Sequence, residues 1–404
     1  MKCCCFGASD RKSNKRGSTN PQHGDGTPHY IVVYINDSKW FNLISCDVGV
    51  LVFIIVPVES SLGGIKHFSY NELKAATNNF DVSHRLGRGG FGIVYKGTLR
   101  NGLQVAVKAL SVESRQGVHE FMTEINTISN VRHPNLVELV GYCIHDSNRI
   151  LVYEYVENNS LDRALLGSKS TNIKLDWEKR SAICLGTAQG LAFLHEELVP
   201  HIVHRDIKAS NILLDKDFNP KIGDFGLAKL FPDDITHIST RIAGTTGYLA
   251  PEYALGGQLT LKADVYGFGV LVLEIVSGRN NASSNWDRKR KLLLEWAWEL
   301  YEEGRLLELV DPEMDDYKEE DVIRYIKVAF FCTQTAATRR PLMSQVVEML
   351  SRNIRLNEKQ LTAPGFFQES IRSSGDPSDK KSLEESTSYQ ISSAPISYTQ
   401  ITPR

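Results

Sequence analysis

The spacing of apolar residues divides the chain into a strand-rich part and a helical part. Between residues 80 and 156, short β-branched and apolar runs are separated by turn residues, a pattern that predicts strands. The expected strands are Ile93–Lys96, Gln104–Leu110, Val137–Cys143 and Ile150–Tyr155. One helix interrupts them at Gly117–Val131, where Phe121, Ile125 and Ile128 form an apolar stripe.

Beyond Val156, apolar residues recur every three or four positions, which predicts helices. The expected helices are Trp177–Glu197, Lys262–Ser277, Leu293–Glu303, Glu320–Thr333 and Met343–Arg352. Another short helix, 69–80, precedes the strands, with Ser69 as its cap and Glu72 at its third position. A small strand-rich part followed by a larger helical part predicts an α+β protein with two lobes.

The two ends of the chain lack this periodicity. Residues 1–28 carry five basic and two acidic side chains, a net charge of +3, and we expect a disordered basic tail. From Ser370 onward, 13 of 35 residues are Ser or Thr. We therefore expect a second disordered tail over residues 355–404.

An apolar segment, residues 29–66, follows the basic tail. Its longest uncharged run, Val48–Val58, has eleven residues and would span about 17 Å as a helix. The hydrocarbon core of a bilayer is roughly 30 Å thick, so an apolar linker is favoured and a transmembrane helix at 43–58 remains the alternative. A secretory signal is disfavoured, because the run is far from the terminus and no small-residue cleavage site follows.

Composition narrows the classes of function. The 404 residues are 42% hydrophobic and 23% charged, which is ordinary for globular domains, and the net charge of -2 gives no sign of nucleic-acid binding. Seven cysteines show no metal-binding spacing and favour a reducing compartment.

A glycine-rich motif opens the strand-rich part. Gly87, Gly89 and Gly92 in "LGRGGFGIVYKG" form a G-x-G-x-x-G pattern. A dinucleotide-binding fold would need a helix directly afterwards, but a β-branched strand follows. The motif therefore predicts either a plain hairpin turn or a hairpin whose backbone lies over phosphates.

Two charged residues are expected to meet behind this hairpin. Lys108 lies among apolar neighbours in "VAVKAL", and Glu124 lies beside the apolar stripe of the predicted helix. A carboxylate at that edge needs a cation, and Lys108 is the natural candidate. The alternative is a lysine facing outward from an edge strand.

A polar cluster lies between apolar runs in "HIVHRDIKASNILLD", residues 201–215. Asp206, Lys208 and Asn211 occupy its centre, and Asp224 follows in "KIGDFGLA". Asn211 and Asp224 are hard oxygen donors of the kind that Mg²⁺ prefers, with nucleotide phosphates filling other positions. Asp206 is then free to accept a proton from a hydroxyl, and Lys208 can neutralise a transferring phosphate; a solvated loop is the alternative.

Taken in order, these motifs resemble the eukaryotic protein kinase family over residues 80–354. The matching elements are the glycine loop, Lys108, Glu124, "HRDIKASN" at 204–211, "DFG" at 224–226 and "APE" at 250–252. Within the family, "FSYNELKAATNNF" and "GTTGYLAPEY" look like the plant receptor-like kinases, and the region through "EKQLTAPG" is similar to the cold-responsive receptor-like cytoplasmic kinases. The segment 30–65 matches nothing expected in this group.

The resemblance implies a bilobal protein-kinase fold that uses ATP and Mg²⁺. The implied parts are a juxta-kinase helix at 67–79, an N-lobe at 80–156 and a C-lobe at 157–354. Lys108 would hold the α- and β-phosphates, and Lys208 resembles the serine/threonine branch. Asp264 would brace the catalytic loop (residues 204–211), and Arg340 would pair with Glu252.

The resemblance also implies a nucleotide pocket. The glycine loop comprises Leu86, Gly87, Arg88, Gly89, Gly90, Phe91 and Gly92. Val94, Ala106 and Leu213 would sandwich the adenine, although plain core packing explains the same residues. Tyr153 would stand at the back of the pocket, and the backbones of Glu154 and Val156 would bond to the adenine.

We expect an active serine/threonine protein kinase that transfers the ATP γ-phosphate to Ser and Thr hydroxyls in membrane-proximal signalling, in a stress or receptor pathway. The alternative is a pseudokinase scaffold that binds partner kinases, which would normally have lost Lys108, Asp206 or Asp224. A receptor with a ligand-binding ectodomain is disfavoured, because few residues precede the kinase region. The expected partners are protein substrates, an upstream receptor kinase and a membrane surface, at the cytoplasmic face of the plasma membrane or in the cytoplasm.

Two kinds of modification are expected. The activation loop, residues 224–252, carries the acceptors Thr236, Ser239, Thr240, Thr245 and Thr246. A phosphate on Ser239 or Thr240 would pair with Arg205, an unpaired cation beside Asp206, whereas the resemblance implies that the Thr245 hydroxyl contacts Asp206 and Lys208. The alternative is that these hydroxyls are merely solvated.

The second modification is lipidation. Cys3, Cys4 and Cys5 beside the basic tail offer acyl sites, unless they are simply unmodified.

Overall fold

The computed structural model describes residues 31–34, 40–45, 51–56, 65–89, 92–110, 115–166, 175–281, 292–352 and 354–365. The chain divides into two units, Met1–Leu62 and Gly63–Arg404, and each is described by itself. The expected basic tail with its three cysteines lies outside the described residues, as does the chain from residue 366 onward.

The first unit contains a small antiparallel sheet. Its strands are β1 (Ile31–Tyr34), β2 (Trp40–Ser45) and β3 (Leu51–Val56), in the order β1-β2-β3. The apolar run considered above as a membrane helix therefore contains strand residues. None of the helices described in either unit combines the length and the apolar character needed to cross a membrane.

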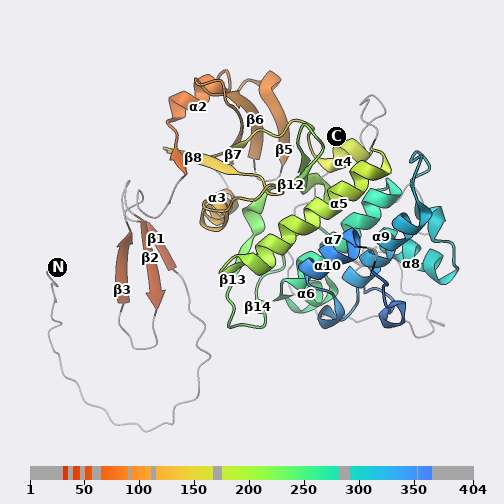
Figure 1. Ribbon diagram of the computed structural model, residues 1–404. Coiled ribbons are helices and arrows are strands. Elements are labelled where there is room, and N and C mark those ends of the chain that lie inside the picture. The colour runs from red at the N-terminus through yellow and green to blue at the C-terminus, as the bar shows by residue number, and fades with distance from the viewer. Residues whose placement is uncertain are drawn as a thin grey trace, which may run out of the picture. The chain divides into compact units, whose positions relative to one another are not determined.

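A six-stranded sheet forms the N-terminal lobe of the second unit (Figure 1), in the order β4-β8-β9-β7-β6-β5. Its strands are β4 (Lys66–His67), β5 (Arg85–Gly89), β6 (Gly92–Thr98), β7 (Gln104–Leu110), β8 (Leu139–His145) and β9 (Asn148–Glu154). Only β4 pairs in parallel, with β8, and the other neighbours are antiparallel. Helix α3 (Arg115–Ile128) packs on β7 and β9, and it buries the stripe of Phe121, Ile125 and Ile128.

The segment before the expected kinase region belongs to the same sheet. Helix α2 (Tyr70–Ala76) begins at Ser69, whose hydroxyl accepts the amide of Glu72 at 3.2 Å. Phe68 and Leu73 are fully buried in a cluster with the sheet residues Val105, Val107, Cys143, Ile150 and Val152. A Cβ on Gly141 would lie 2.1 Å from the Lys66 carbonyl oxygen, so glycine permits β4 to approach β8.

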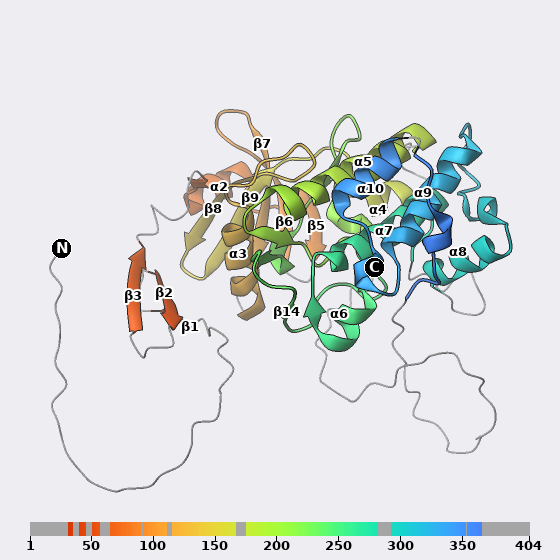
Figure 2. The same cartoon turned by 60° about the horizontal axis from the view of Figure 1, so that its bottom comes forward.

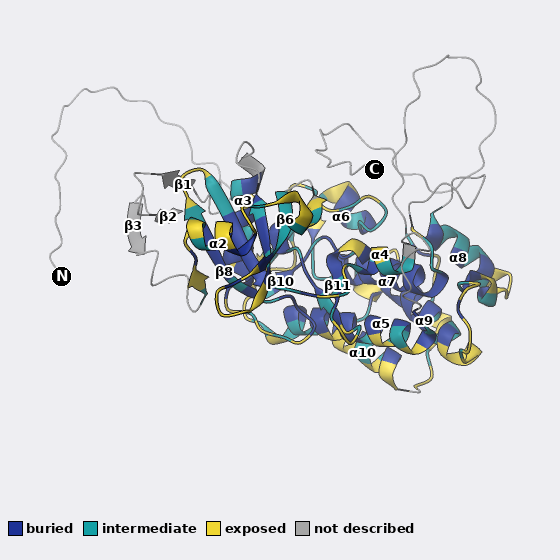
Figure 3. Cartoon of the chain, turned by 90° about the horizontal axis from the view of Figure 1, so that it is seen from above, coloured by how far each residue is buried: buried dark blue, intermediate teal, exposed yellow. Residues whose placement is uncertain are grey.

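The C-terminal lobe is built around one helix, α7 (Lys262–Ser277), which lies among the other helices of the lobe (Figure 2). Every residue of α7 from Ala263 to Ser277 is buried (Figure 3). Helix α7 contacts α5, α8 and α9, and Gly278 ends it with φ 63°. The helices of the lobe are α4 (Leu161–Leu166), α5 (Trp177–Ala192), α6 (Pro251–Gly256), α7, α8 (Leu293–Glu302), α9 (Glu319–Cys332) and α10 (Met343–Ser351).

Short elements complete the second unit. Three two-stranded sheets pair β10 (His201–Val203) with β13 (Lys229–Phe231), β11 (Ile212–Leu214) with β12 (Pro220–Ile222), and β14 (Ile238–Ser239) with β15 (Gln258–Leu259). A π-helical turn, η2 (Phe193–Glu197), extends α5. The 3₁₀ turns are η1 (Val82–His84), η3 (Ala209–Asn211), η4 (Phe225–Leu227), η5 (Leu306–Leu309), η6 (Ala337–Arg339) and η7 (Glu358–Gln360).

The predicted α+β class, with a strand-rich part before a helical part, is confirmed. Several features differ from the expected pattern, among them helices α4 and α6, which were not anticipated. Strands β4 and β5 were not anticipated, because one has two residues and the other is rich in glycine. Residues 355–365, which we expected to belong to the C-terminal tail, instead make contacts with the C-terminal lobe through Thr362 and Gly365.

We predict that Phe68→Ala lowers the free energy of unfolding by about 3–5 kcal/mol, because the ring is fully buried under the sheet. Urea unfolding followed by tryptophan fluorescence measures the loss. Val82→Ala is the control, since Val82 is 72% exposed and should change stability by less than about 0.5 kcal/mol. Equal effects in the two variants would contradict a core role for Phe68.

Candidate active site

A buried lysine joins three elements at the boundary of the two lobes. Lys108 on β7 places its ammonium nitrogen 2.7 Å from a carboxylate oxygen of Glu124 on α3 and 2.7 Å from one of Asp224, which follows β12. Burial alone would lower the pKa of Lys108, but the two carboxylates outweigh burial and raise it. The lysine therefore stays charged and ties the sheet, the helix and the start of the activation loop together.

Glu124 is fixed on both of its oxygens. Its second oxygen accepts a hydrogen bond from the hydroxyl of Tyr153 on β9. Burial raises the pKa of Glu124, while the Lys108 ammonium and the Tyr153 hydroxyl oppose that rise. Tyr153 thus lies next to the pair of Lys108 and Glu124 and holds the second oxygen of the carboxylate.

Asn211 and Asp224 meet at one end of the β11–β12 hairpin. The Gly223 amide donates to the Asn211 carbonyl oxygen at 2.9 Å, and Asp224 takes the left-handed backbone conformation with φ 62° and ψ 70°. Asn211 uses its amide nitrogen on Asp206, at 2.8 Å to the carbonyl oxygen and 3.1 Å to the carboxylate.

These two side chains keep free oxygens that fit a divalent cation. Among the described residues, none donates a hydrogen bond to the amide oxygen of Asn211 or to the second carboxylate oxygen of Asp224. Burial alone would raise the pKa of Asp224, but Lys108 outweighs it, so the pKa is lowered and the carboxylate is ionised. An ionised carboxylate beside an amide oxygen suits Mg²⁺.

The Asp206 carboxylate is held by two further side chains. The Thr245 hydroxyl donates to one oxygen at 2.7 Å, and the Lys208 ammonium lies 2.9 Å from the other. Lys208 also donates to the Thr245 hydroxyl at 2.8 Å, which uses both the acceptor and the donor of that hydroxyl. The activation loop and the catalytic loop therefore meet at Asp206.

Asp264 on α7 holds the catalytic loop from the buried side. Its carboxylate accepts the backbone amides of His204 at 2.7 Å and Arg205 at 2.8 Å, and it lies 3.0 Å from His195. Burial would raise the pKa of Asp264, but these hydrogen bonds, with that of His195 the largest, lower it. Farther down the lobe, buried Arg340 makes two bonds of 2.7 Å to Glu252 at the end of the activation loop.

The expected nucleotide residues line neighbouring strands. Ala106 on β7 pairs across the sheet with Lys96 on β6 and Tyr153 on β9, and Val94 pairs with Lys108. Leu213 comes from β11 in the other lobe. The Glu154 side chain accepts the Glu138 amide and Lys221, each at 2.9 Å, so its backbone is fixed where β9 ends; Val156, two residues on, is buried.

The glycine motif forms a hairpin between β5 and β6, in which Gly89 pairs with Gly92. Leu86, Gly87, Arg88 and Gly89 lie on β5, whereas Gly90 and Phe91 lie outside the described residues. A Cβ on Gly92 would lie 2.2 Å from the Ala109 carbonyl oxygen, so this position requires glycine.

Arg205 differs from the expectation. The sequence suggested an unpaired cation, but its guanidinium donates to the Tyr253 hydroxyl and to the carbonyl oxygens of Leu227 at 3.1 Å and Arg241 at 2.8 Å. The acceptors are neutral and come from segments distant in sequence, so no local sequence pattern could predict them.

The five candidate acceptors of the activation loop differ in their surroundings. Thr236, Ser239 and Thr246 are exposed, and Thr245 is engaged with Asp206. The Thr240 hydroxyl, next to strand β14, accepts from Lys229 on β13 at 3.1 Å. Burial first, and then the nearby Arg205, lower the pKa of Lys229, which indicates two cations close to one another.

Sequence reasoning missed Lys229, Tyr253 and the pair of Tyr248 and Glu274. The Tyr248 hydroxyl donates to the buried Glu274 carboxylate on α7 at 2.7 Å, and the Asn281 amide donates to the same oxygen at 2.7 Å. A glutamate inside the apolar run "VYGFGVLVLEIVSG" was a signal, because a buried charge needs partners.

Comparison with known proteins finds a kinase family and similar plant protein kinases. Residues 80–350 match the family described as protein tyrosine and serine/threonine kinase. The chain is 52% identical to cold-responsive protein kinase 1 of Arabidopsis thaliana over 311 residues, which cover 76% of this chain and 80% of that protein.

Larger receptors are also similar. Two probable LRR receptor-like serine/threonine-protein kinases of Arabidopsis thaliana are 52% and 56% identical over 83% and 74% of this chain. The chain spans only 33% and 29% of their lengths.

We predict a pH-dependent stability difference between the wild type and Glu274→Gln. Burial raises the pKa of Glu274 from its usual value of 4.5 to about 7. The folded chain therefore keeps a proton that the unfolded chain has released, and this contribution to stability is lost as the pH rises from 4.5 to about 7.

Glutamine cannot titrate. The free energy of unfolding of Glu274→Gln should therefore rise relative to that of the wild type across this pH window, and the difference should then stay constant. Urea unfolding at several pH values gives the difference, in which other titrating groups cancel. A difference that stays constant from pH 4.5 to 7 would contradict the raised pKa.

Proposed function

Because this chain belongs to the protein tyrosine and serine/threonine kinase family, as a plant serine/threonine protein kinase, we propose that it phosphorylates Ser and Thr hydroxyls of protein substrates in membrane-proximal signalling. The observation that carries the proposal is the contact of Lys108 with both Glu124 and Asp224. This contact would hold the side chains that face the phosphates in one arrangement, near Asp206.

Nucleotide binding follows from the same residues. The family uses ATP and typically Mg²⁺, which supply the phosphoryl group and neutralise its charge. Asn211 and Asp224 would hold Mg²⁺ through their free oxygens, and Lys108 would hold the α- and β-phosphates. The glycine hairpin would cover the phosphates, and the adenine would lie among Val94, Ala106 and Leu213, bonded to the backbones of Glu154 and Val156.

Phosphoryl transfer then needs one proton acceptor. As the substrate hydroxyl oxygen bonds to the γ-phosphorus, the bond from that phosphorus to the bridging oxygen of ADP breaks, and Asp206 takes the hydroxyl proton. Lys208 offsets charge on the moving group, and Thr245 orients the carboxylate that receives the proton.

A pseudokinase scaffold is the second candidate. Such a protein would normally lack one of the phosphate, metal or base residues. Here all three are present: Lys108 donates to Asp224, and Asp206 accepts from Thr245. The two functions separate in one assay, since only a catalyst transfers labelled phosphate.

We predict that Lys108→Met and Asp224→Asn each leave a folded but nearly inactive protein, because each removes charge that faces the phosphates or Mg²⁺. Asp206→Asn should slow transfer by about 10²–10⁴-fold. Phosphate incorporation into a generic substrate measures the loss, and Lys74→Met, which changes an exposed lysine on α2, is the matched control. Activity within about tenfold of wild type in any of the three would overturn the assignment.

Regulation would act through the activation loop. We propose Thr240 as the phosphorylated residue, because its hydroxyl already contacts Lys229 and lies on the segment that Arg205 binds through the Arg241 carbonyl oxygen. A phosphate there would exchange neutral acceptors of Arg205 for a charged one.

We predict that preincubation with ATP activates the wild type and Ser239→Ala but not Thr240→Val, and that phosphatase treatment slows the wild type far more than Arg205→Ala. Initial rates before and after treatment give the comparison. Full activation of Thr240→Val would move the modification to another residue, and equal losses in wild type and Arg205→Ala would exclude Arg205 as the phosphate ligand.

Location and input are further parts of the proposal. An upstream receptor kinase would activate the chain at the cytoplasmic face of the plasma membrane, in a stress or receptor pathway. The name of the similar cold-responsive protein kinase 1 supports a response to stress. Acylation of Cys3, Cys4 and Cys5 beside the basic tail would supply the two signals that stable anchoring needs.

We predict that changing these three cysteines to serine moves the protein from the membrane fraction to the soluble fraction. Fractionation in high salt, with Cys46→Ser as the matched control, measures the shift. Retention of the triple variant on membranes would rule out acylation at these cysteines as the anchor.

A further inference from the structure

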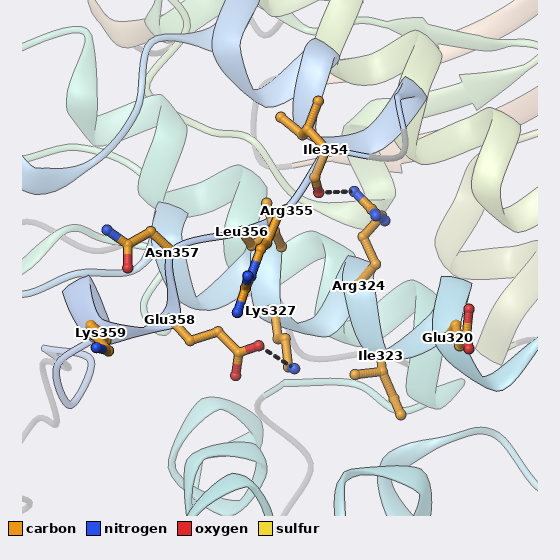
Figure 4. A pocket seen from close by; sticks show the side chains of 10 residues that line it. All are labelled: Glu320, Ile323, Arg324, Lys327, Ile354, Arg355, Leu356, Asn357, Glu358 and Lys359. Atoms are coloured by element: carbon orange, nitrogen blue, oxygen red, sulfur yellow. Dashed lines mark hydrogen bonds and ion pairs between the residues drawn. The ribbon is translucent and has the colours of Figure 1, made fainter.

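The chain does not end with the last helix of the lobe but returns across it. After α10, the Ile354 carbonyl oxygen accepts from Arg324 at 2.9 Å, and the Glu358 carboxylate binds Lys327 at 2.7 Å (Figure 4). Residues 354–365 are called the C-terminal strap below. The strap and α9 line an open pocket of about 750 Å³, and the strap lies beyond residue 350, where the family match ends.

The far end of the strap is bound by three residues of the lobe. The Tyr266 hydroxyl on α7 donates to the Gly365 carbonyl oxygen at 2.7 Å. The Thr362 hydroxyl donates to the side-chain oxygen of Gln334 at 2.7 Å, and the Thr335 hydroxyl donates to the Ala363 carbonyl oxygen at 3.0 Å.

The same three residues position Arg340. Its guanidinium donates to the carbonyl oxygens of Gln334 at 2.8 Å and Thr335 at 3.3 Å, and it lies 5.1 Å from the centre of the Tyr266 ring. Arg340 in turn makes both of its short bonds to Glu252. The strap and Arg340 therefore contact the same three residues, Tyr266, Gln334 and Thr335.

The strap also approaches the end of the activation loop directly. A Cβ on Gly365 would lie 3.0 Å from the Pro251 ring, the residue before Glu252. Arg340 and Gln334 are 2% and 1% exposed with the strap in place. In an ion pair that water can reach, solvent screens the attraction and the side chains are held less firmly in one geometry, so the cover matters to the position of Arg340.

We propose that the C-terminal strap is a positioning element for catalysis: by binding Tyr266, Gln334 and Thr335, it fixes Arg340 on Glu252 and so holds the activation loop whose Thr245 contacts Asp206. In the part of the chain that the structure describes, no hydrogen bond or ion pair joins the strap to the expected nucleotide residues or to Lys108 and its two carboxylates. Its release lowers the turnover number and leaves the KM for ATP unchanged.

The test releases the strap in the full-length chain with two conservative changes. Tyr266→Phe removes the hydroxyl that binds Gly365 but keeps the ring under Arg340, and Thr362→Val removes the donor to Gln334. Lys359→Ala, on an exposed strap residue, is the control. Hydrogen exchange over residues 361–365 reports release, and kcat and the KM for ATP are measured well below the unfolding temperature.

The expected result for the double variant is faster exchange, a kcat reduced about tenfold and an unchanged KM for ATP, with the control like wild type. In a Glu252→Gln background, release of the strap should lower kcat much less, because the ion pair of Arg340 and Glu252 through which it acts is already weakened.

Four results would overturn the proposal. The first is a normal kcat despite faster exchange, and the second is an equal loss of kcat in the wild-type and Glu252→Gln backgrounds. The third is a parallel change in the KM for ATP, which would indicate general loosening of the fold. The fourth is unchanged exchange, which would show that these bonds do not hold the strap.

Discussion

The site depends on one buried cation between two carboxylates. Removing Lys108 from water is unfavourable, and only the pairing with Glu124 and Asp224 compensates for it. Each partner belongs to a different element, so the three must come together for any of them to be buried at acceptable cost. Electrostatics thereby link the sheet, helix α3 and the activation loop into one arrangement, and the distances of 2.7 Å show that this arrangement is formed.

The C-terminal lobe meets this arrangement with a rigid base. Helix α7 is buried from Ala263 to Ser277, and three of its buried side chains, Asp264, Tyr266 and Glu274, each bind a different segment. Asp264 binds the backbone of the catalytic loop, Glu274 binds Tyr248 of the activation loop, and Tyr266 carries Arg340 and the strap. A single helix thus sets the positions of loops that are remote from one another in sequence.

The sequence revealed those parts of the fold whose cause is local. The period of two residues predicted β7 with the bounds that the structure has, and the period near 3.6 did the same for α7. The sequence also predicted that Lys108 and Glu124 are partners, because each is a charged residue beside apolar positions with no evident partner nearby in the sequence.

Contacts set by tertiary packing were beyond its reach. The acceptors of Arg205 are a tyrosine hydroxyl and two carbonyl oxygens, and carbonyl oxygens leave no trace in a sequence. The strap was missed for a related reason, since a short polar segment looks unstructured until the residues beneath it are known.

The Thr245 hydroxyl has one proton to give, and it gives that proton to Asp206. With Lys208 and Asn211 also bound, both oxygens of that carboxylate have partners. A movement of the activation loop that displaced Thr245 would therefore also remove a donor from Asp206. The position of one loop thus changes the hydrogen bonding of a side chain in the other.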